Sequence, residues 1–312
     1  MTQAAIASKT ASAATRHFSA HPTAINMQVG MMPFKMRHGL ADNPLFSLEA
    51  MTDLASALPR DKVDYNLANL PVDVAGKHVP FNGLSPANTI KSIETCGSWM
   101  VLKSMESVPA YNALLDELVD EIAHLSGVAA STFDHRVAYG FVTSPGGVTP
   151  FHLDSEHNFL LQIAGTKTIT ILPHQATTTA EDIEISPAKS RYIEYRPAFS
   201  TLAQTFELSA GDAVCVPFND PHYVENGDSV SVSMGVTFHD LTTWHRRKVA
   251  TVNHMLRSIG LPQERPGLRP GQDKMKAVAY DAFNAVIKPV RDNQTARQFV
   301  KKHLLRGAAV TP

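Results

Sequence analysis

The sequence contains one His-x-Asp tripeptide, formed by His152, Leu153 and Asp154. Residues i and i+2 of an extended strand point to the same face, so the imidazole and the carboxylate can converge on one metal ion. A third ligand is expected from a later strand that lies beside the first, and His222 follows an apolar strand predicted at 213–216. Two imidazoles and one carboxylate on one side of a metal leave coordination positions open for substrate and dioxygen.

The tripeptide alone is a weak signal, because a chain with 14 histidines should contain about one by chance. The alternative is an ordinary buried hydrogen-bonded pair, with His222 at the cap of a loop. The position of the pair favours a metal site. His152 and Asp154 stand at the start of a strand-rich region, and His222 follows a Gly211-Asp212 turn and a strand.

A lysine supports the same site independently. In the strand predicted at 166–172, alternation places Lys167 on the face of Ile169 and Ile171, whereas the threonines occupy the other face. A strand lysine usually points to solvent, but here the polar face is already filled. An unpaired charge is costly to bury, so the ammonium requires a counter-charge. A dicarboxylate that chelates the metal at one end would supply it at the other.

Short apolar runs separated by turn residues must position these side chains. The turns contain Gly or Pro, as in Pro145-Gly146-Gly147 and Asn226-Gly227-Asp228. Strands are predicted at 137–143, 158–163, 166–172, 182–185, 205–208, 213–216 and 229–238. This spacing is typical of an antiparallel sandwich or a small barrel.

Helical periodicity flanks the strand-rich region on both sides. Helices are predicted at 47–58, 109–126, 243–259, 273–287 and 296–305. The chain is therefore expected to comprise a loosely ordered N-terminal arm (1–40), a catalytic domain with N-terminal helices (41–240) and a helical C-terminal region (241–312). An apolar stripe in that last region, at Val249, Val252, Leu256 and Ile259, predicts a homodimer contact.

The bulk composition describes a protein that can bury a large core, with 44% hydrophobic and 18% charged residues in 312. No apolar run reaches the roughly 18 residues of a membrane span. The two cysteines are too few for a disulfide framework, and we expect a cytoplasmic protein without a membrane partner. Residues 241–312 carry a net charge of +10 and residues 1–240 carry −11. The basic region is more often a solvated or subunit-facing surface than a nucleic-acid site, so nucleic acid is an unlikely partner.

The stretch from Thr149 to Lys167, TPFHLDSEHNFLLQIAGTK, together with the distant Pro221-His222, resembles the JmjC and cupin-like (cupin-8) oxygenases. The likeness is greatest to the branch that contains the asparaginyl hydroxylase of hypoxia-inducible factor. It covers about 137–239, roughly one third of the chain. The triad, the threonine before it, the asparagine after it and the lysine all occur in register.

The resemblance implies a mainly β fold, with a double-stranded β-helix (jelly roll) core between N-terminal and C-terminal helices. It implies Fe(II), the cosubstrate 2-oxoglutarate, and O2. The implied metal ligands are His152, Asp154 and His222. The implied cosubstrate-binding residues are Lys167 and Thr149 for the far carboxylate, Asn158 for a supporting hydrogen bond, and Tyr139 on the preceding strand.

The resulting hypothesis is a 2-oxoglutarate-dependent dioxygenase, a hydroxylase or demethylase that couples 2-oxoglutarate decarboxylation to oxidation of a substrate C–H bond. The substrate is an unidentified small molecule or peptide. Two alternatives stay open. One is a non-oxidative metal-binding cupin with the same ligands, which would not require the inward Lys167. The other is a regulatory binding protein that uses the basic C-terminal helices, although these lack a recognition-helix or zinc-finger signature.

Overall fold

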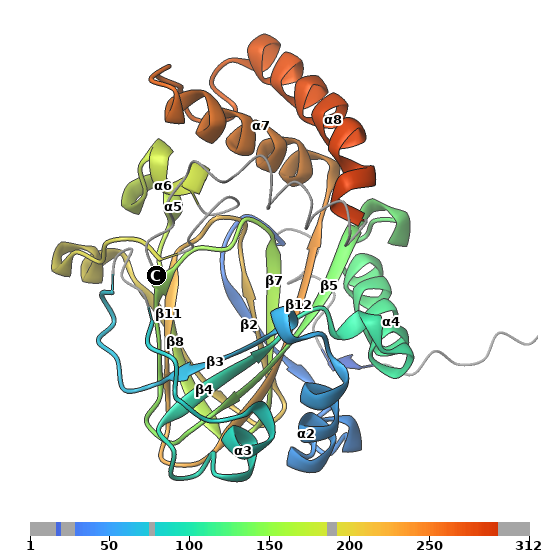
Figure 1. The fold of residues 1–312 in the computed structure, drawn as a ribbon, viewed down its shortest axis with the longest axis vertical. Helices are drawn as coiled ribbons and strands as arrows, with labels where there is room; N and C mark the ends of the chain where they lie inside the picture. The colour runs from blue at the N-terminus through green and yellow to red at the C-terminus, as the bar shows by residue number, and fades with distance from the viewer. Residues whose placement is uncertain (1–16, 20–28, 75–78, 186–191, 293–312) are drawn as a thin grey trace, which may run out of the picture.

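Two antiparallel β-sheets form the centre of the protein, and helices lie against one sheet and at one end (Figure 1). The computed structural model describes residues 17–19, 29–74, 79–185 and 192–292. The eight-stranded sheet has the order β1 (Phe18–Ser19), β2 (Phe34–His38), β10 (Asp212–Val216), β7 (His157–Ala164), β12 (Ser231–His239), β5 (Asp134–Thr143), β4 (Ser98–Leu102), β3 (Val63–Leu67). The four-stranded sheet has the order β6 (Val148–His152), β11 (His222–Asn226), β8 (Thr166–Ile171), β9 (Gln204–Ser209).

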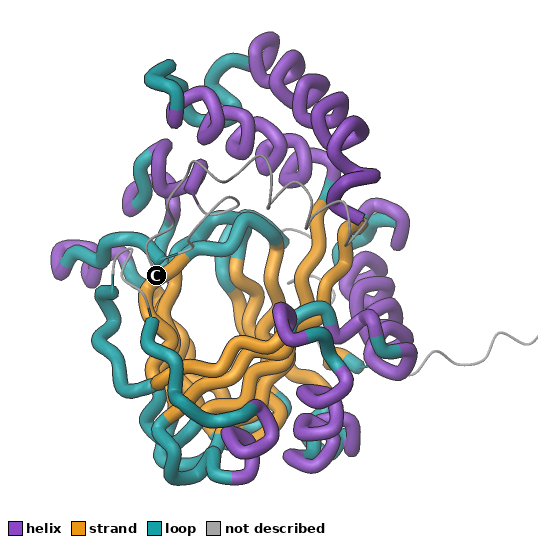
Figure 2. Tube along the Cα trace, in the orientation of Figure 1, coloured by secondary structure: helices purple, strands orange, loops and turns teal. Residues whose placement is uncertain are grey.

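The two sheets enclose an apolar interior (Figure 2), because alternate residues of each strand point inward. The large sheet contributes Leu160, Val214 and Val216. The small sheet contributes Ile169, Ile171, Leu208 and Val224. The predicted mainly β fold with a jelly-roll core is thus confirmed.

A second and larger core lies on the outer face of the eight-stranded sheet. On β12 the residues that point outward are Val232, Met234, Val236 and Phe238, all buried. They share this core with helices α2 (Leu48–Ala57) and α4 (Pro109–Leu125), and α3 (Pro86–Lys91) lies beside α2. Short 3-10 turns lie between the longer elements: η1 (Pro44–Phe46), η2 (Arg60–Lys62), η3 (Met105–Ser107) and η4 (Ala130–Thr132) near these helices, and η5 (Pro197–Leu202) before β9. The large sheet is therefore buried on both faces over its central strands.

Four further helices gather at the end of the barrel where β8 stops and β11 begins (Figure 1). Helices α5 (His174–Thr177) and α6 (Ala180–Ile185) form an insertion between β8 and β9. Helix α7 (Leu241–Ser258) follows β12 directly and packs against α6 and α8 (Pro270–Asp292). We call this end of the barrel the metal end. None of the described helices is long and apolar enough to cross a membrane.

The structure differs from the sequence prediction in several elements. Residues 182–185, predicted as a strand, lie in helix α6. Strand β2 falls within the predicted N-terminal arm and pairs with β10, while β3 and β4 extend the sheet beyond β5. In the predicted dimer stripe of α7, Val249 is completely buried, whereas Ile259 is 72% exposed. The helix predicted at 296–305 lies outside the described residues.

Candidate metal centre

The structure brings the three predicted ligands together at the metal end. One ligand atom from each of His152, Asp154 and His222 lies within 4.8 Å of the others. The Nε2 atom of His152 is 3.9 Å from Asp154 Oδ2, and that of His222 is 3.7 Å from the same oxygen. The histidines are buried, and the side chain of Asp154 is 10% exposed. No other such cluster of metal-binding side chains occurs in the part of the chain that the structure describes.

Backbone carbonyl groups fix the orientation of both imidazoles. His152 Nδ1 lies 2.8 Å from the carbonyl oxygen of Pro150, and His222 Nδ1 lies 3.1 Å from that of Asp220. A carbonyl oxygen only accepts, so each Nδ1 carries the proton and each Nε2 presents a lone pair to the centre. Two neutral imidazoles and one carboxylate with open positions suit non-haem Fe(II). The residues therefore fit the predicted ion.

Strand pairing explains how ligands 70 residues apart meet, since His222 on β11 is the register partner of His152 on β6. The register is irregular beyond this pair. The next partners are Val224 and Thr149, which lie two residues from His222 on β11 but three residues from His152 on β6. This bulge turns Thr149 to the face of the ligand histidines. Val224 also pairs with Ile169 of β8, so Thr149 lies on the inner face next to the row that contains Lys167.

Lys167 lies inside the barrel, as its alternation with the threonines predicted, and its residue is 6% exposed. The turn that leads into its strand depends on Gly165, which has a φ of +71° and lies where a Cβ would be 2.4 Å from the Val230 carbonyl oxygen. Lys167 Nζ donates to Ser233 Oγ of the opposite sheet at 2.5 Å. Among the described residues, no Asp or Glu forms an ion pair with Lys167. Burial lowers the pKa of its ammonium to about 7.

The opposite wall of the barrel contains the other two predicted cosubstrate residues. Tyr139 on β5 pairs with Gly235 of β12, and Asn158 on β7 pairs with Thr237. A side chain at Gly235 would approach Phe141 to 3.1 Å and Asn158 Oδ1 to 3.7 Å, so glycine keeps this wall open. Asn158 Oδ1 is buried and has no hydrogen-bond partner among the described residues. A buried acceptor of this kind is available to a ligand.

Comparison with known proteins gives one match to a family model. The family model of the JmjC domain matches residues 117–244. Residues 117–244 of this chain are therefore similar to the JmjC domain. The match includes all seven predicted site residues. It is to the JmjC domain as a whole and does not single out the asparaginyl hydroxylase branch.

Solved structures that resemble this chain are distant. An X-ray structure of YcfD from Escherichia coli is 15% identical, with a TM-score of 0.48, and the alignment covers 87% of this chain and 69% of that chain. YcfD with cobalt and 2-oxoglutarate, described as a ribosomal oxygenase, is 15% identical, with a TM-score of 0.44 and coverages of 85% and 66%. EvdO2 from Micromonospora carbonacea var. aurantiaca with 2-oxoglutarate is 17% identical, with a TM-score of 0.35 and coverages of 45% and 66%. No curated protein matches the sequence.

The matched region also contains a polar contact that sequence reasoning did not assign. Ser233 is a neutral side chain that accepts a hydrogen bond from Lys167. It lies on the inner face of β12 with Ser231, Gly235 and Thr237. Alternation marks that face as small and polar in the sequence. The contact itself depends on how the two sheets face one another, and alternation within one strand does not specify this.

Proposed function

We propose that this JmjC protein is an Fe(II)- and 2-oxoglutarate-dependent oxygenase in which His152, Asp154 and His222 hold the iron and Lys167 binds the far carboxylate of 2-oxoglutarate. The buried Lys167 is the observation that carries the proposal. A buried ammonium without a carboxylate partner indicates an anionic ligand, and this one lies in the barrel that contains the triad. A metal-binding cupin that uses no dicarboxylate would not require it.

In this proposal the protein orients the metal ligands, binds the far carboxylate of 2-oxoglutarate and excludes water from the interior of the barrel. When bound, Fe(II) with 2-oxoglutarate supplies the oxidation of a substrate C–H bond by O2, with 2-oxoglutarate converted to succinate and CO2. The carbonyl groups of Pro150 and Asp220 hold the two imidazoles in the metal-binding tautomer. Lys167 and Ser233 bind the far carboxylate, and the apolar interior excludes water from that charge pair.

The remaining predicted residues have supporting roles in this proposal. Thr149 donates its hydroxyl to the cosubstrate from the small sheet. Asn158 supplies a supporting hydrogen bond near the cosubstrate, since its buried side chain faces the open wall at Gly235. Tyr139 forms the adjacent part of that wall. The substrate is a small molecule or a peptide side chain, oxidised by hydroxylation or N-demethylation.

The proposal extends to assembly and location. We propose a cytoplasmic homodimer, with the contact on the outer face of α8, defined by Met275, Val278 and Val286. These side chains are 62–76% exposed and recur at helical spacing. The catalytic domain and the C-terminal region keep the proposed boundary at residues 240 and 241, whereas residues 34–38 of the predicted arm (1–40) belong to the large sheet of the catalytic domain (41–240) and residues 241–312 follow it. Of these, the C-terminal region supplies the dimer contact.

Anaerobic addition of Fe(II) and 2-oxoglutarate to the metal-free protein tests the site. The wild type should develop the visible charge-transfer absorption of an iron chelated by a 2-oxo acid. Asp154→Ala and His222→Ala should each lose that absorption and 2-oxoglutarate turnover while they keep the far-UV circular dichroism of the wild type. His124→Ala, an exposed histidine on α4, is the matched control and should retain both. Wild-type turnover in both ligand variants would show that the triad assignment is wrong.

A further inference from the structure

The first turns of helix α7 contact the metal end. The contacts are made by Glu156 and His157, which follow Asp154 closely in the sequence. Glu156 Oε2 lies 3.7 Å from Arg247 Nη1, and His157 Nε2 lies 3.5 Å from Asp240 Oδ2. Asp240 is also the N-cap of α7, where it accepts from the Thr243 amide at 2.7 Å. The start of α7 is thus fixed to the chain immediately after a predicted ligand.

Arg247 makes a second contact in this region, with the buried His239. Burial, and then the charge of Arg247, lower the pKa of His239 to about 3, so the ring is neutral. Arginine can only donate, and it lies 3.3 Å from His239 Nε2. The other ring nitrogen therefore carries the proton and donates to Thr243 Oγ1 at 3.3 Å. These contacts connect α7 to the end of β12 as well.

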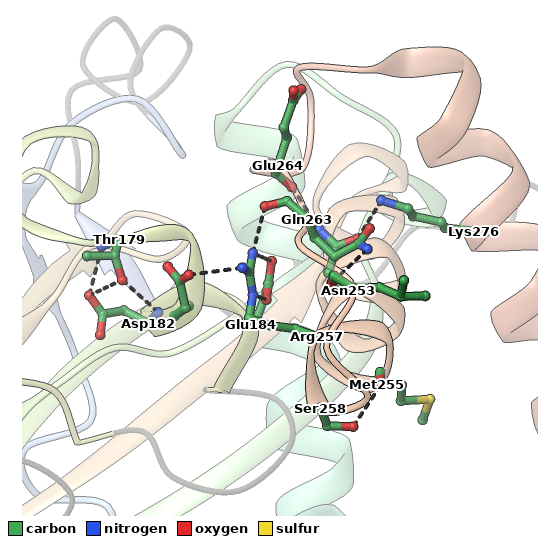
Figure 3. Close-up of polar contacts among 12 residues, drawn as sticks. Thr179, Asp182, Glu184, Asn253, Met255, Arg257, Ser258, Gln263, Glu264 and Lys276 are labelled. Carbon is green, nitrogen blue, oxygen red and sulfur yellow. Dashed lines mark hydrogen bonds and ion pairs between the residues drawn. The ribbon is translucent and has the colours of Figure 1, made fainter.

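The last turn of α7 contacts the insertion at the opposite side of the metal end (Figure 3). Arg257 binds Glu184 of α6 through Nε at 2.7 Å and Nη2 at 3.1 Å. Its Nη1 lies 3.0 Å from Glu181, and its Nη2 also donates to the carbonyl of Gln263 at 2.6 Å. The Glu184 side chain is completely buried. All three guanidinium nitrogens are therefore used, and the buried carboxylate has a bidentate partner.

The insertion that α7 holds touches the strands of both predicted ligand histidines. At its start, His174 Nδ1 lies 2.6 Å from Asp220 Oδ1, and the Asp220 carbonyl oxygen is the group that orients His222. After α6, Tyr192 forms a β-bridge with His152. Helix α6 has six residues, too few for a stable isolated helix, so its position depends on such tertiary contacts.

We propose that helix α7 braces the metal end at two points, and that Arg257 is a positioning residue for His152 and His222. It acts through Glu184 and the α5–α6 insertion, not by contact with metal or substrate. The inference rests on the proposed function, since it takes these histidines as ligands. Loss of the Arg257–Glu184 pair releases α6 and loosens the orientation of both imidazoles. Substitution of the groups that orient metal ligands typically weakens metal affinity by about 10-fold to 100-fold.

Titration of the metal-free protein with Co(II), followed by its visible absorption, tests the brace without turnover. Arg257→Met and Glu184→Gln should each weaken Co(II) binding by roughly 10-fold and alter the band shape. The double variant should bind no more weakly than the single ones, because both remove the same pair. Arg257→Lys, which keeps the charge, should recover part of the affinity. Arg269→Met is the matched control: it removes an exposed ion pair with Glu264 and should leave Co(II) binding unchanged.

Each possible result decides the question. Folded Arg257→Met and Glu184→Gln proteins with wild-type Co(II) affinity and spectrum would show that the pair stabilises the fold alone. If Arg257→Met does not fold, Glu184→Gln decides instead: a folded variant with weakened Co(II) affinity supports the brace, and wild-type affinity overturns it. Failure of the wild type to bind Co(II) would overturn the proposed metal centre, and the brace with it.

Discussion

Two cations in this protein, the partly buried Arg257 and the buried Lys167, lie in opposite electrostatic surroundings. Arg257, between α6 and α7, has the fully buried carboxylate of Glu184 as a bidentate partner, and this contact raises the pKa of the guanidinium. Lys167, inside the barrel, has the neutral hydroxyl of Ser233 as its side-chain partner among the described residues, and burial lowers its pKa to about 7. The described chain neutralises the charge of Arg257 itself, whereas the charge of Lys167 is the one that the proposed ligand would neutralise.

The difference separates a structural charge from a binding charge. A buried ion without its counter-ion costs several kcal/mol, so a fold keeps one only when something offsets that cost. At Arg257 the offset is within the chain, and removal of either partner should affect folding or positioning. At Lys167 the offset is the proposed 2-oxoglutarate carboxylate, and removal of the lysine should affect binding.

The largest expected effect is on cosubstrate affinity. Lys167→Ala should weaken 2-oxoglutarate binding by roughly 10² to 10³, since loss of one partner of a buried charge pair costs on the order of 3 to 5 kcal/mol. Iron binding should change little. Lys167→Arg should recover part of the loss, because a guanidinium still pairs with a carboxylate but has a different shape. Side-by-side titration of the iron-loaded proteins measures this, and equal affinities for wild type and Lys167→Ala would remove the assignment.

The next largest effect is on the free energy of unfolding, which should change in opposite directions when the Arg257 ion pair and the Lys167 charge are removed. Glu184→Ala leaves the half-exposed Glu181 as the carboxylate partner of Arg257 among the described residues, and should lower the free energy of unfolding by about 3 kcal/mol. Lys167→Met, without 2-oxoglutarate, removes an uncompensated charge and should leave that free energy unchanged or raise it. Urea denaturation of both variants at neutral pH gives the comparison. A loss of stability in Lys167→Met as large as that in Glu184→Ala would mean that Lys167 is structural.

A smaller effect should appear in the pH dependence of 2-oxoglutarate affinity. The ligand-free lysine is mostly neutral above pH 7, and the bound carboxylate requires it charged, so binding takes up a proton. Affinity should therefore fall as pH rises above about 7, by up to roughly tenfold per pH unit. Titrations at about pH 6.5 and about pH 8.5 measure the slope. Lys167→Arg stays charged, and the slope should disappear in that variant; a slope that persists would arise from another group.

The lowered pKa of Lys167 also makes the stability of the ligand-free protein depend on pH. The lysine titrates near 7 in the folded chain and near its ordinary value of 10.5 in the unfolded chain. Between these values the unfolded state binds more protons, so the ligand-free protein gains stability from this group as pH rises through the window. Below pH 7 the full cost of the buried charge is present.

Substitutions on the outer face of α8 should have the smallest effect on 2-oxoglutarate binding. Glutamate at both Met275 and Val286, on the outer face of α8, should convert the proposed dimer to a monomer. The affinity for 2-oxoglutarate should stay within about twofold, because distant sites act independently. Lys274→Glu on the same helix is the charge control. Sedimentation across micromolar concentrations reads the result, and a wild type that is already monomeric would contradict the proposal.

Local periodicity predicted the features of the site that depend on one strand. The two-residue spacing of His152 and Asp154 placed both on one face, and alternation placed Lys167 inside. The fold is confirmed by the two sheets, and the predicted enzyme class with its Fe(II), 2-oxoglutarate and O2 requirement agrees with the match of residues 117–244 to the JmjC domain. The ligand roles of single residues stay predictions. Their positions in the structure agree with those roles.

Features that depend on distant contacts could not be predicted in this way. Residues 182–185, Asp-Ile-Glu-Ile, alternate like a strand, but Glu184 is held by Arg257 from 73 residues away and the segment is helical. Strands β3 and β4 are stable because they extend the sheet from β5, which their own sequence does not show. The contact of Ser233 with Lys167 needs the packing of two sheets.

The pairing of β6 with β11 also means that the two predicted ligand histidines enclose a long segment of the chain. His152 and His222 meet across a closed segment of 70 residues, so an ion held by both cross-links the chain as a disulfide would, although reversibly. For a loop of this length the chain-entropy estimate of such a cross-link is on the order of 4 kcal/mol. The ion should therefore protect the whole jelly roll against unfolding, and removal by a chelator should make strands β6 to β11 accessible to proteases well before the helices on the outer face of the large sheet.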